Sequence, residues 1–153
     1  MNTLTTIWIA LPLLVGFGIY LFPKLDRTLA LAVASLSIGY GCWQVLSPSE
    51  LTLVLLDRFG VTLMVDSLSG FFILTNGLVT AAVVLYCWHK GKSAFFYTQA
   101  IILHGSINSV FICADFISVY VALEVISIAA FLLITYPRSN RSIWVGLRYL
   151  FIR

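Results

Sequence analysis

The chain has 153 residues, of which 61% are hydrophobic and only 10% are charged. Soluble domains carry about 45–50% apolar and about 25% charged residues, so the composition excludes an ordinary soluble domain. The net charge of +3 comes from basic residues scattered over short loops, which excludes a basic patch for nucleic acid. The class that remains is a polytopic helical membrane protein.

Long uncharged runs predict the membrane spans, because a spanning helix needs about 20 mainly apolar residues. In chain order the predicted spans are residues 5–22, 28–46, 67–88, 94–113 and 116–136, followed by the start of a sixth near Ser142. The fold class is therefore all-α, with residues 1–153 forming a single transmembrane domain. The first span has no Lys or Arg before it, which is typical of a retained helix rather than a cleaved signal peptide.

Residues 51–66, "LTLVLLDRFGVTLMVD", are too broken by charge and glycine to cross the membrane. Two short β-rich runs flank the polar turn "DRFG", and this pattern predicts a β-hairpin between helices two and three. An open sheet edge cannot stand in lipid, so we expect the hairpin at the outer membrane face. Asp66 follows in "DSLS" and is predicted to be the N-cap of the third helix.

The basic residues of the loops predict the orientation. The loops after the first, third and fifth spans carry nearly all of these basic residues: Lys24, Arg27, His89, Lys90, Lys92, Arg138 and Arg141. The loop after the second span carries only Arg58, and the loop after the fourth carries no base. Because Lys and Arg favour the cytoplasmic side, we expect the N-terminus on the outer or lumenal side.

Glu124 is an acid inside the fifth apolar run. With a helix from Phe116, it lies roughly 12 Å below the outer surface, near the middle of the bilayer. A charge there costs at least about 2.5 kcal/mol, so the side chain must face protein, water or a cation. Tyr120 and Ser127 share its helical face, whereas Asp115 stays at the membrane boundary. Either Glu124 belongs to a proton or ion pathway, or it is a protonated, hydrogen-bonded structural residue.

The fourth span carries a second polar stripe. Tyr97, His104 and Asn108 fall close to one helical face. His104 is either a member of a proton relay or a neutral histidine bonded to a neighbouring helix. Gly105 and Ser106 are small residues that permit close contact between helices.

Other chemistry is not indicated by motif. Cys42, Cys87 and Cys113 fall in apolar runs without a CxxC, so they are interpreted as small buried hydrophobes. The sequence has no Gly-rich phosphate loop and no GxSxG, and its two histidines do not form a metal pair. We therefore expect no cofactor and no metal. Arg148 in the sixth run is close enough to the inner surface for its side chain to reach it.

Three stretches together resemble a known family. They are "VDSLSGFFILTNGLV", "HGSINSVFICADFISVYVALEVISIAAFLLI" and "VGLRYLFI". They are similar to the antiporter-like membrane subunits of respiratory and photosynthetic complex I, and to the D-type subunits of multi-subunit sodium/proton antiporters. The most specific features are the spacing of Asp115, Glu124 and Ser127 and the pair Arg148-Tyr149.

The resemblance implies roles for individual residues. Glu124 matches a buried glutamate on the fifth helix that partners a lysine on the seventh helix, in a proton path at the bilayer midplane. Arg148 matches the basic position of the sixth helix, and His104 matches a variable position. The expected proton-pathway residues are therefore Glu124, His104 and Arg148, and the expected supporting polar face is Tyr120, Ser127 and Asn108.

Family members are longer chains with two inverted repeats. The resemblance therefore implies that residues 1–153 are the N-terminal part of a larger fold, truncated and not competent alone. Without the lysine of the seventh helix, we expect Glu124 to be protonated, or paired with Arg153 or another subunit.

The implied function is a proton- or cation-translocating subunit of a complex I-type quinone oxidoreductase or a multi-subunit cation/proton antiporter. As an enzyme component it is at most a redox-free subunit of an NAD(P)H- or ferredoxin-quinone oxidoreductase. The expected partners are other membrane subunits and the lipid bilayer, without nucleic acid, in a bacterial inner membrane, a thylakoid or an organelle equivalent. The alternative is a non-transporting membrane scaffold or assembly subunit.

Overall fold

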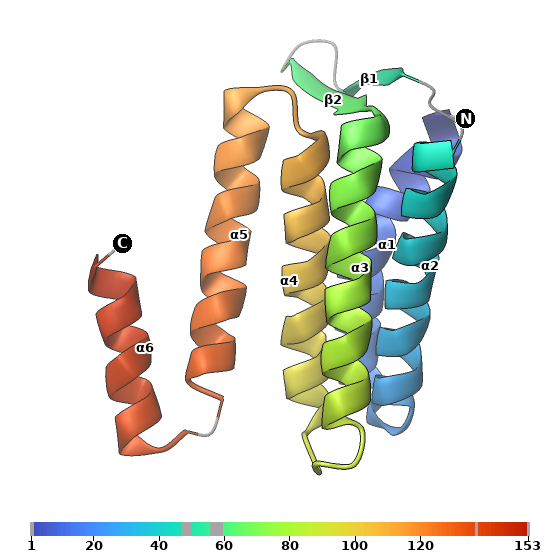
Figure 1. Cartoon of the computed structure of the whole chain (residues 1–153). Coiled ribbons are helices and arrows are strands. Elements are labelled where there is room, and N and C mark those ends of the chain that lie inside the picture. The colour runs from blue at the N-terminus through green and yellow to red at the C-terminus, as the bar shows by residue number, and fades with distance from the viewer. Residues whose placement is uncertain (1, 47–49, 56–59, 137, 153) are drawn as a thin grey trace.

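The structure is a computed structural model, and it describes residues 2–46, 50–55, 60–136 and 138–152. The helices up to residue 112 stand side by side, and those of residues 116–134 and 140–152 follow along one side of them (Figure 1). The elements in chain order are α1 (Asn2–Leu21), a short 3-10 helix η1 (Pro23–Leu25), α2 (Asp26–Leu46), β1 (Leu51–Leu55), β2 (Val61–Val65), α3 (Ser67–Cys87), α4 (Ala94–Ile112), α5 (Phe116–Ile134) and α6 (Asn140–Ile152). Each predicted span therefore coincides with a helix to within a few residues.

Four helical segments of the described chain are long and apolar enough to cross a membrane. They are Pro23–Leu46, Ser67–Cys87, Ala94–Ile112 and Phe116–Ile134. The described apolar part of α1, Thr5–Leu21, is shorter. The chain is thus a mostly helical membrane protein with a small sheet, and a count of five spans plus part of a sixth stays a prediction.

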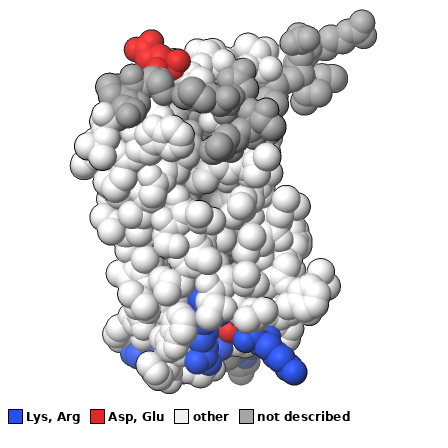
Figure 2. Space-filling model, turned by 90° about the vertical axis from the view of Figure 1, so that its right-hand side faces the viewer, with Lys and Arg blue, Asp and Glu red and all other residues white. Residues whose placement is uncertain are grey.

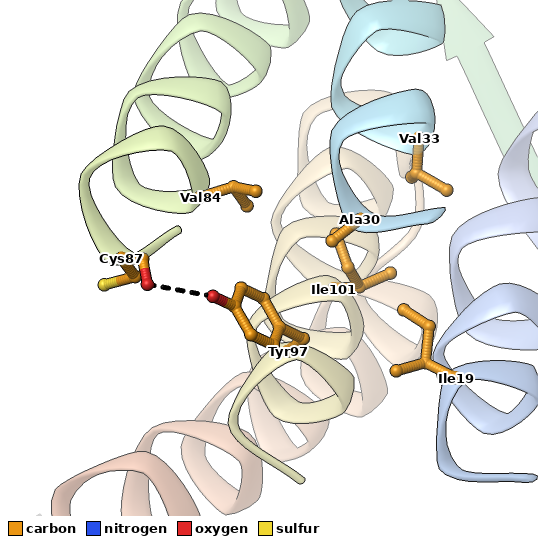
Figure 3. Packing of buried hydrophobic residues seen from close by; sticks show 7 residues of the cluster. All are labelled: Ile19, Ala30, Val33, Val84, Cys87, Tyr97 and Ile101. Carbon is orange, nitrogen blue, oxygen red and sulfur yellow. Dashed lines mark hydrogen bonds between the residues drawn. The ribbon is translucent and has the colours of Figure 1, made fainter. Parts of the chain in front are cut away.

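A buried cluster joins the first four helices near one end of the bundle (Figure 3). Its members are Ile19, Ala30, Val33, Val84, Cys87, Tyr97 and Ile101. The Tyr97 hydroxyl donates a hydrogen bond of 3.1 Å to the carbonyl oxygen of Cys87, which satisfies the polar end of this buried ring. Cys87 is buried, as expected, whereas Cys42 and Cys113 are partly buried.

At several helix contacts an added Cβ on glycine would clash with the neighbouring helix, and two of them illustrate this. A Cβ at Gly41 of α2 would lie 2.7 Å from the backbone nitrogen of Leu74 in α3. A Cβ at Gly105 of α4 would lie 2.7 Å from the Cβ of Pro12 in α1. The close contact expected at Gly105 is therefore present. Small residues at such crossings let apolar helices gain van der Waals contact in a membrane.

The predicted hairpin is present. Strands β1 and β2 pair antiparallel, in a register from Leu51 opposite Val65 to Leu55 opposite Val61. Part of the predicted turn, residues 56–59, lies outside the described residues. A second buried cluster fastens the sheet to the bundle: Trp8, Leu53, Leu63, Val65, Ile73 and Ile112. The hairpin thus covers the end of the bundle where α1 begins and α4 turns into α5 (Figure 1).

Two aspartates fix the starts of helices at this end. Asp66 accepts hydrogen bonds of 2.7 Å from the backbone nitrogen and from the hydroxyl of Ser69, which confirms the predicted N-cap. Asp115 accepts from the backbone nitrogen of Ser118 at 2.8 Å and caps α5. Its other carboxylate oxygen accepts from the backbone nitrogen of Thr62 in β2 at 3.0 Å. These hydrogen bonds lower the pKa of both carboxyl groups, most strongly those from Ser69 to Asp66 and from Ser118 to Asp115.

We expect Asp115→Ala to loosen the hairpin, because one carboxylate caps α5 and holds β2. The readout is amide hydrogen exchange at Thr62 in detergent or nanodiscs, which should become faster. Asp115→Asn is the matched control, since it keeps one acceptor oxygen and should lose less protection. Unchanged exchange at Thr62 in Asp115→Ala would contradict this role.

The contribution of Asp115 to stability depends on pH. Because the pKa of Asp115 is lowered in the folded protein, the stabilisation by its carboxylate is present above about pH 4 and is lost as the pH falls through that lowered pKa.

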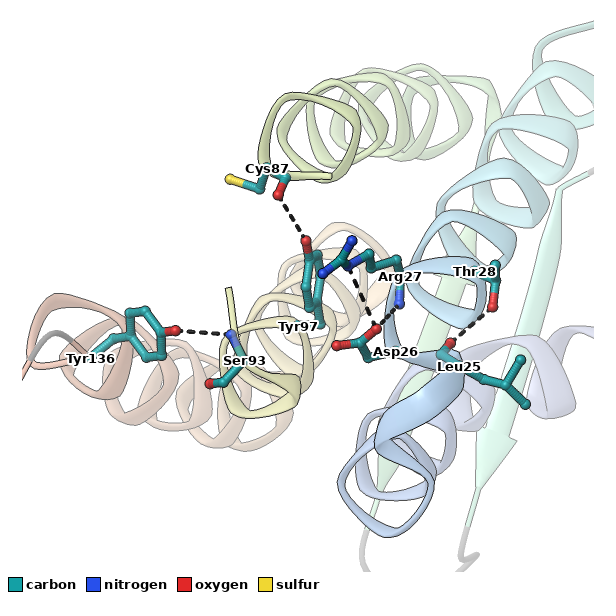
Figure 4. A network of polar contacts seen from close by, with 8 residues as sticks. All are labelled: Leu25, Asp26, Arg27, Thr28, Cys87, Ser93, Tyr97 and Tyr136. Carbon is teal, nitrogen blue, oxygen red and sulfur yellow. Dashed lines mark hydrogen bonds and ion pairs between the residues drawn. The ribbon is translucent and has the colours of Figure 1, made fainter. Parts of the chain in front are cut away.

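Lysine and arginine gather at the end of the bundle opposite the hairpin (Figure 2). The loops there are tied to the helices by polar contacts (Figure 4). The backbone nitrogen of Ser93 donates to the Tyr136 hydroxyl at 2.9 Å, and Arg27 lies 4.0 Å from the Asp26 carboxylate. The Lys92 ammonium lies 5.3 Å from the centre of the Tyr136 ring. At this end, called the basic end below, the described loop residues thus contact one another and the helix ends.

Candidate functional site

A polar network lies inside the bundle, around His104 of α4. His104 is 1% exposed, and its ring contacts side chains from two helices and from its own. Nε2 lies 2.9 Å from the Ser37 hydroxyl of α2 and 3.1 Å from Nδ2 of Asn108, one turn further along α4. Nδ1 lies 2.9 Å from the Thr80 hydroxyl of α3. One imidazole therefore joins three helices.

Asn76 of α3 completes the network. Its amide nitrogen donates to the backbone carbonyl oxygen of His104 at 3.1 Å and to Oδ1 of Asn108 at 2.7 Å. The five residues Ser37, Asn76, Thr80, His104 and Asn108 are called the His104 network below. Buried polar groups in an apolar bundle need such partners, since an unsatisfied one costs about 1–3 kcal/mol.

The His104 network lies close to the middle of the helices that form it. Ser37 is near the centre of α2, Asn76 and Thr80 are near the centre of α3, and His104 is near the centre of α4. Because α2, α3 and α4 are each long and apolar enough to span a membrane, this level corresponds to the bilayer interior.

A groove of about 320 Å³ runs beside the network. Asn76, Thr80 and His104 line one part of it, and apolar side chains line the rest, including Phe96 near the start of α4 and Leu133 near the end of α5. Because both helix ends belong to the basic end, the groove extends from there toward the His104 network.

Glu124 occupies a matching level on α5, close to the middle of Phe116–Ile134, and its side chain is partly buried. The residues predicted to form a polar face with Glu124 differ in their exposure. Ser127 is 4% exposed, and its hydroxyl donates to the Leu123 carbonyl of its own helix at 2.8 Å. Tyr120 is 64% exposed. The helical face with Glu124 therefore runs from the outside of the fold at Tyr120 to the inside at Ser127.

Arg148 lies on an exposed side of α6 and lines a shallow apolar groove with Val145, Tyr149 and Ile152. Helix α6 packs against α5, the helix of Glu124. Arg153, which the sequence offered as a partner for Glu124, lies outside the described residues. Of the predicted site residues, the structure brings His104 and Asn108 into direct contact and places Arg148 on the helix next to that of Glu124.

Sequence reasoning missed three members of the network: Ser37, Asn76 and Thr80. A signal was available for two of them, because Asn76 and Thr80 are four residues apart and share a face of a helix that has no charged residue. Among the described residues, no group of three or more His, Cys, Asp and Glu side chains could hold a metal ion.

Comparison with known proteins gives matches over most of the chain, although no family model matches it. The chain is 29% identical over 165 residues to "NAD(P)H-quinone oxidoreductase chain 4 1" of Synechococcus sp. (strain JA-3-3Ab), covering 95% of this chain and 30% of that protein. It is 24% identical over 96 residues to the D-type subunit of a Na(+)/H(+) antiporter of Bacillus subtilis (strain 168), covering 60% and 20%. The chain thus spans less than a third of the length of these relatives.

A solved structure has the same fold. A chain of the membrane-bound sulfane sulfur reductase, an archaeal respiratory membrane complex, superposes with a TM-score of 0.79 at 17% sequence identity. The superposition covers 96% of this chain and 33% of the other. Together with the two sequence relatives, this match confirms the resemblance found in the sequence, and the partial coverage fits a chain that corresponds to one part of the longer proteins.

Proposed function

We propose that this chain, a homologue of antiporter-like membrane subunits, forms part of a proton- or cation-translocating module. The parent assembly would be a complex I-type quinone oxidoreductase or a multi-subunit cation/proton antiporter. The relatives that support this proposal are components of such assemblies by their names, and this chain matches less than a third of their length. We therefore propose one transmembrane domain that works together with further parts of the module and is not competent alone.

The observation that carries the proposal is the polar layer halfway along otherwise apolar helices. Glu124 stands near the middle of α5, and the His104 network stands near the middle of α2, α3 and α4. An ionisable residue at that depth is costly in a membrane, and such residues commonly mark ion pathways. A fold that only needed to pack its helices could place apolar residues at this level.

In this proposal Glu124 takes up and releases the transported proton. Arg148 supplies positive charge on helix α6, which packs against α5. Tyr120 and Ser127 are on the same face of α5 and support the path as hydrogen-bonding groups. His104 lines it from α4, together with the groove that leads from the basic end, and Asn108 supports the His104 ring. The chain itself carries no redox step.

The proposed orientation places the basic end at the cytoplasmic side, because Lys and Arg favour that side. The hairpin and the N-terminus then face the outer or lumenal side of a bacterial, thylakoid or organelle membrane. The large apolar side chains Phe116, Trp144 and Phe151 are 95%, 74% and 83% exposed. They would contact lipid or another membrane component of the assembly.

The competing function is a scaffold that fills a helix-packing position without moving ions, and the close contact of Gly105 with Pro12 favours it as a second candidate. Gly105→Leu should weaken the contact between α1 and α4 by about 1–3 kcal/mol or more, as overpacking does. A scaffold would be damaged by Gly105→Leu and unharmed by Glu124→Gln. A transport protein should lose proton transport in Glu124→Gln while its assembly with partners, measured by co-purification, stays normal.

A further inference from the structure

The donors and acceptors of the His104 network can be assigned from one fixed point, the backbone carbonyl of His104. A carbonyl oxygen can only accept, so the Asn76 side-chain atom 3.1 Å from it must be the amide nitrogen. The same nitrogen lies 2.7 Å from Asn108, so the Asn108 atom facing it must be the acceptor Oδ1. The orientation of both amides follows from this.

The orientation of Asn108 decides the state of the imidazole. With Oδ1 turned to Asn76, Asn108 presents its amide nitrogen to Nε2 of His104 at 3.1 Å. An amide nitrogen only donates, so Nε2 must be the unprotonated acceptor. The Ser37 hydroxyl, 2.9 Å from the same nitrogen, then approaches as a second donor, and the two donors share the single lone pair of Nε2. A neutral imidazole carries its hydrogen on the other nitrogen, which places it on Nδ1, directed to the Thr80 hydroxyl at 2.9 Å.

We infer that His104 is held as the neutral imidazole with its hydrogen on Nδ1, and that it is a positioning residue that joins α2, α3 and α4. A proton added to Nε2 would face the donor group of Asn108. To accept it, Asn108 would have to turn, and its contact with Asn76 would be lost. In terms of the proposed function, on which this part of the inference rests, the transported proton goes through Glu124 and not through His104.

The charged side chains on the elements packed against α4 agree with this role. Helices α1 and α3 and strand β2 contain no Asp, Glu, Lys or Arg. Helix α2 has Asp26 and Arg27 at its first two positions, far along the helix from Ser37. Helix α5 has Glu124. The contacts that fix the His104 ring are all made with neutral groups, so no ionised partner is needed to explain its geometry.

The direct test is nitrogen NMR of the chain labelled with ¹⁵N-histidine in nanodiscs, in which protonated and unprotonated ring nitrogens have well-separated shifts. The chain has two histidines, so His89→Gln in the exposed loop leaves the signals of His104 alone. The expected spectrum has a protonated Nδ1 and an unprotonated Nε2 at neutral pH. A spectrum with both nitrogens protonated, or with the hydrogen on Nε2, would overturn the assignment.

A variant that replaces the hydrogen-bond donor facing Nε2 by an acceptor provides a stricter test. Asn108→Asp keeps an acceptor for Asn76 and places a second acceptor against Nε2, so the proton should move to Nε2 or the ring should become cationic. Ser109→Asp is the control, since it adds the same group one residue further, where the native hydroxyl bonds to the Gly105 carbonyl. Its spectrum should keep the native pattern. A native pattern in Asn108→Asp would contradict the proposed assignment of donors and acceptors. If neither variant folds, the spectrum of the protein with an unchanged His104 network tests the assignment by itself.

A transport assay distinguishes a positioning role of His104 from a role as a proton carrier. His104→Asn leaves an amide that can still donate toward Thr80 but cannot carry a proton. It should reduce transport by no more than about tenfold, the effect of losing a neutral hydrogen bond. Transport at background level in a well-assembled His104→Asn protein would overturn the positioning role. If Glu124→Gln transports normally, the proposed function fails, whereas the NMR assignment of His104 is unaffected.

Discussion

Glu124→Gln is expected to lower proton transport by about 10²-fold or more, the range by which a positioned acid or base accelerates proton transfer. Glutamine has nearly the shape of a protonated glutamic acid, so packing around the middle of α5 should be kept. It cannot release a proton, so the step that the proposal assigns to this residue is removed. The measurement is proton uptake by membrane vesicles that contain the complete assembly, followed with a pH-sensitive dye.

Glu50→Gln is the matched control for this experiment. Glu50 is an exposed acid in the connection before β1, outside every helix that is long enough to span the membrane. Its replacement by glutamine removes one carboxyl group from the chain, as Glu124→Gln does, and should leave the rate of proton uptake unchanged. Normal uptake in Glu124→Gln, with equal amounts of assembled protein, would contradict the pathway role and favour a scaffold.

Gly41→Ala is expected to destabilise the fold by about 1–3 kcal/mol or more, the usual effect of an overpacked core. The added Cβ would lie 2.7 Å from the backbone nitrogen of Leu74 and 2.9 Å from the carbonyl oxygen of Gly70. These atoms belong to the backbone of α3 and cannot turn aside as a flexible side chain could. Helices α2 and α3 would have to separate, and the close packing between them would be lost.

Gly39→Ala, two residues earlier on the same helix, is the control. A Cβ there meets no atom within 4 Å. The change should leave stability unchanged or raise it by up to about 1 kcal/mol, because alanine favours a helix more than glycine does. Thermal unfolding in detergent, followed by circular dichroism, compares the two variants. Equal melting temperatures for Gly41→Ala and Gly39→Ala would show that α2 and α3 do not pack as closely as described.

Much of the fold could be predicted because it depends on local composition. Long apolar runs define the helices, the β-rich runs at 51–66 define the hairpin, and the N-cap at Asp66 follows from its position before a helix. The His104 network could not be predicted, because it depends on which helices become neighbours. Ser37 and Thr80 are separated from His104 by 67 and 24 residues along the chain.

The face of α5 shows the same limit at a smaller scale. Helical spacing places Tyr120, Glu124 and Ser127 on one side of the helix. Where that side changes from exposed to buried depends on how α4 and α6 pack against α5, and spacing alone carries no information about this. Tyr120 therefore differs from Ser127 in burial, although the two residues were predicted to belong to one polar face of the helix.

The bonds of Asp115 and its neighbours also have a mechanical consequence. Thr62 of β2 donates to the Asp115 carboxylate and accepts from the backbone nitrogen of Ala114, at 3.0 and 2.8 Å, and Leu63 pairs with Cys113. The hairpin is thus fastened to the residues that directly precede α5. A tilt of α5, the helix that carries Glu124, must either move β2 with it or break these bonds. A spin label on the surface of β2 would therefore act as an external sensor of motion at the Glu124 carboxyl group.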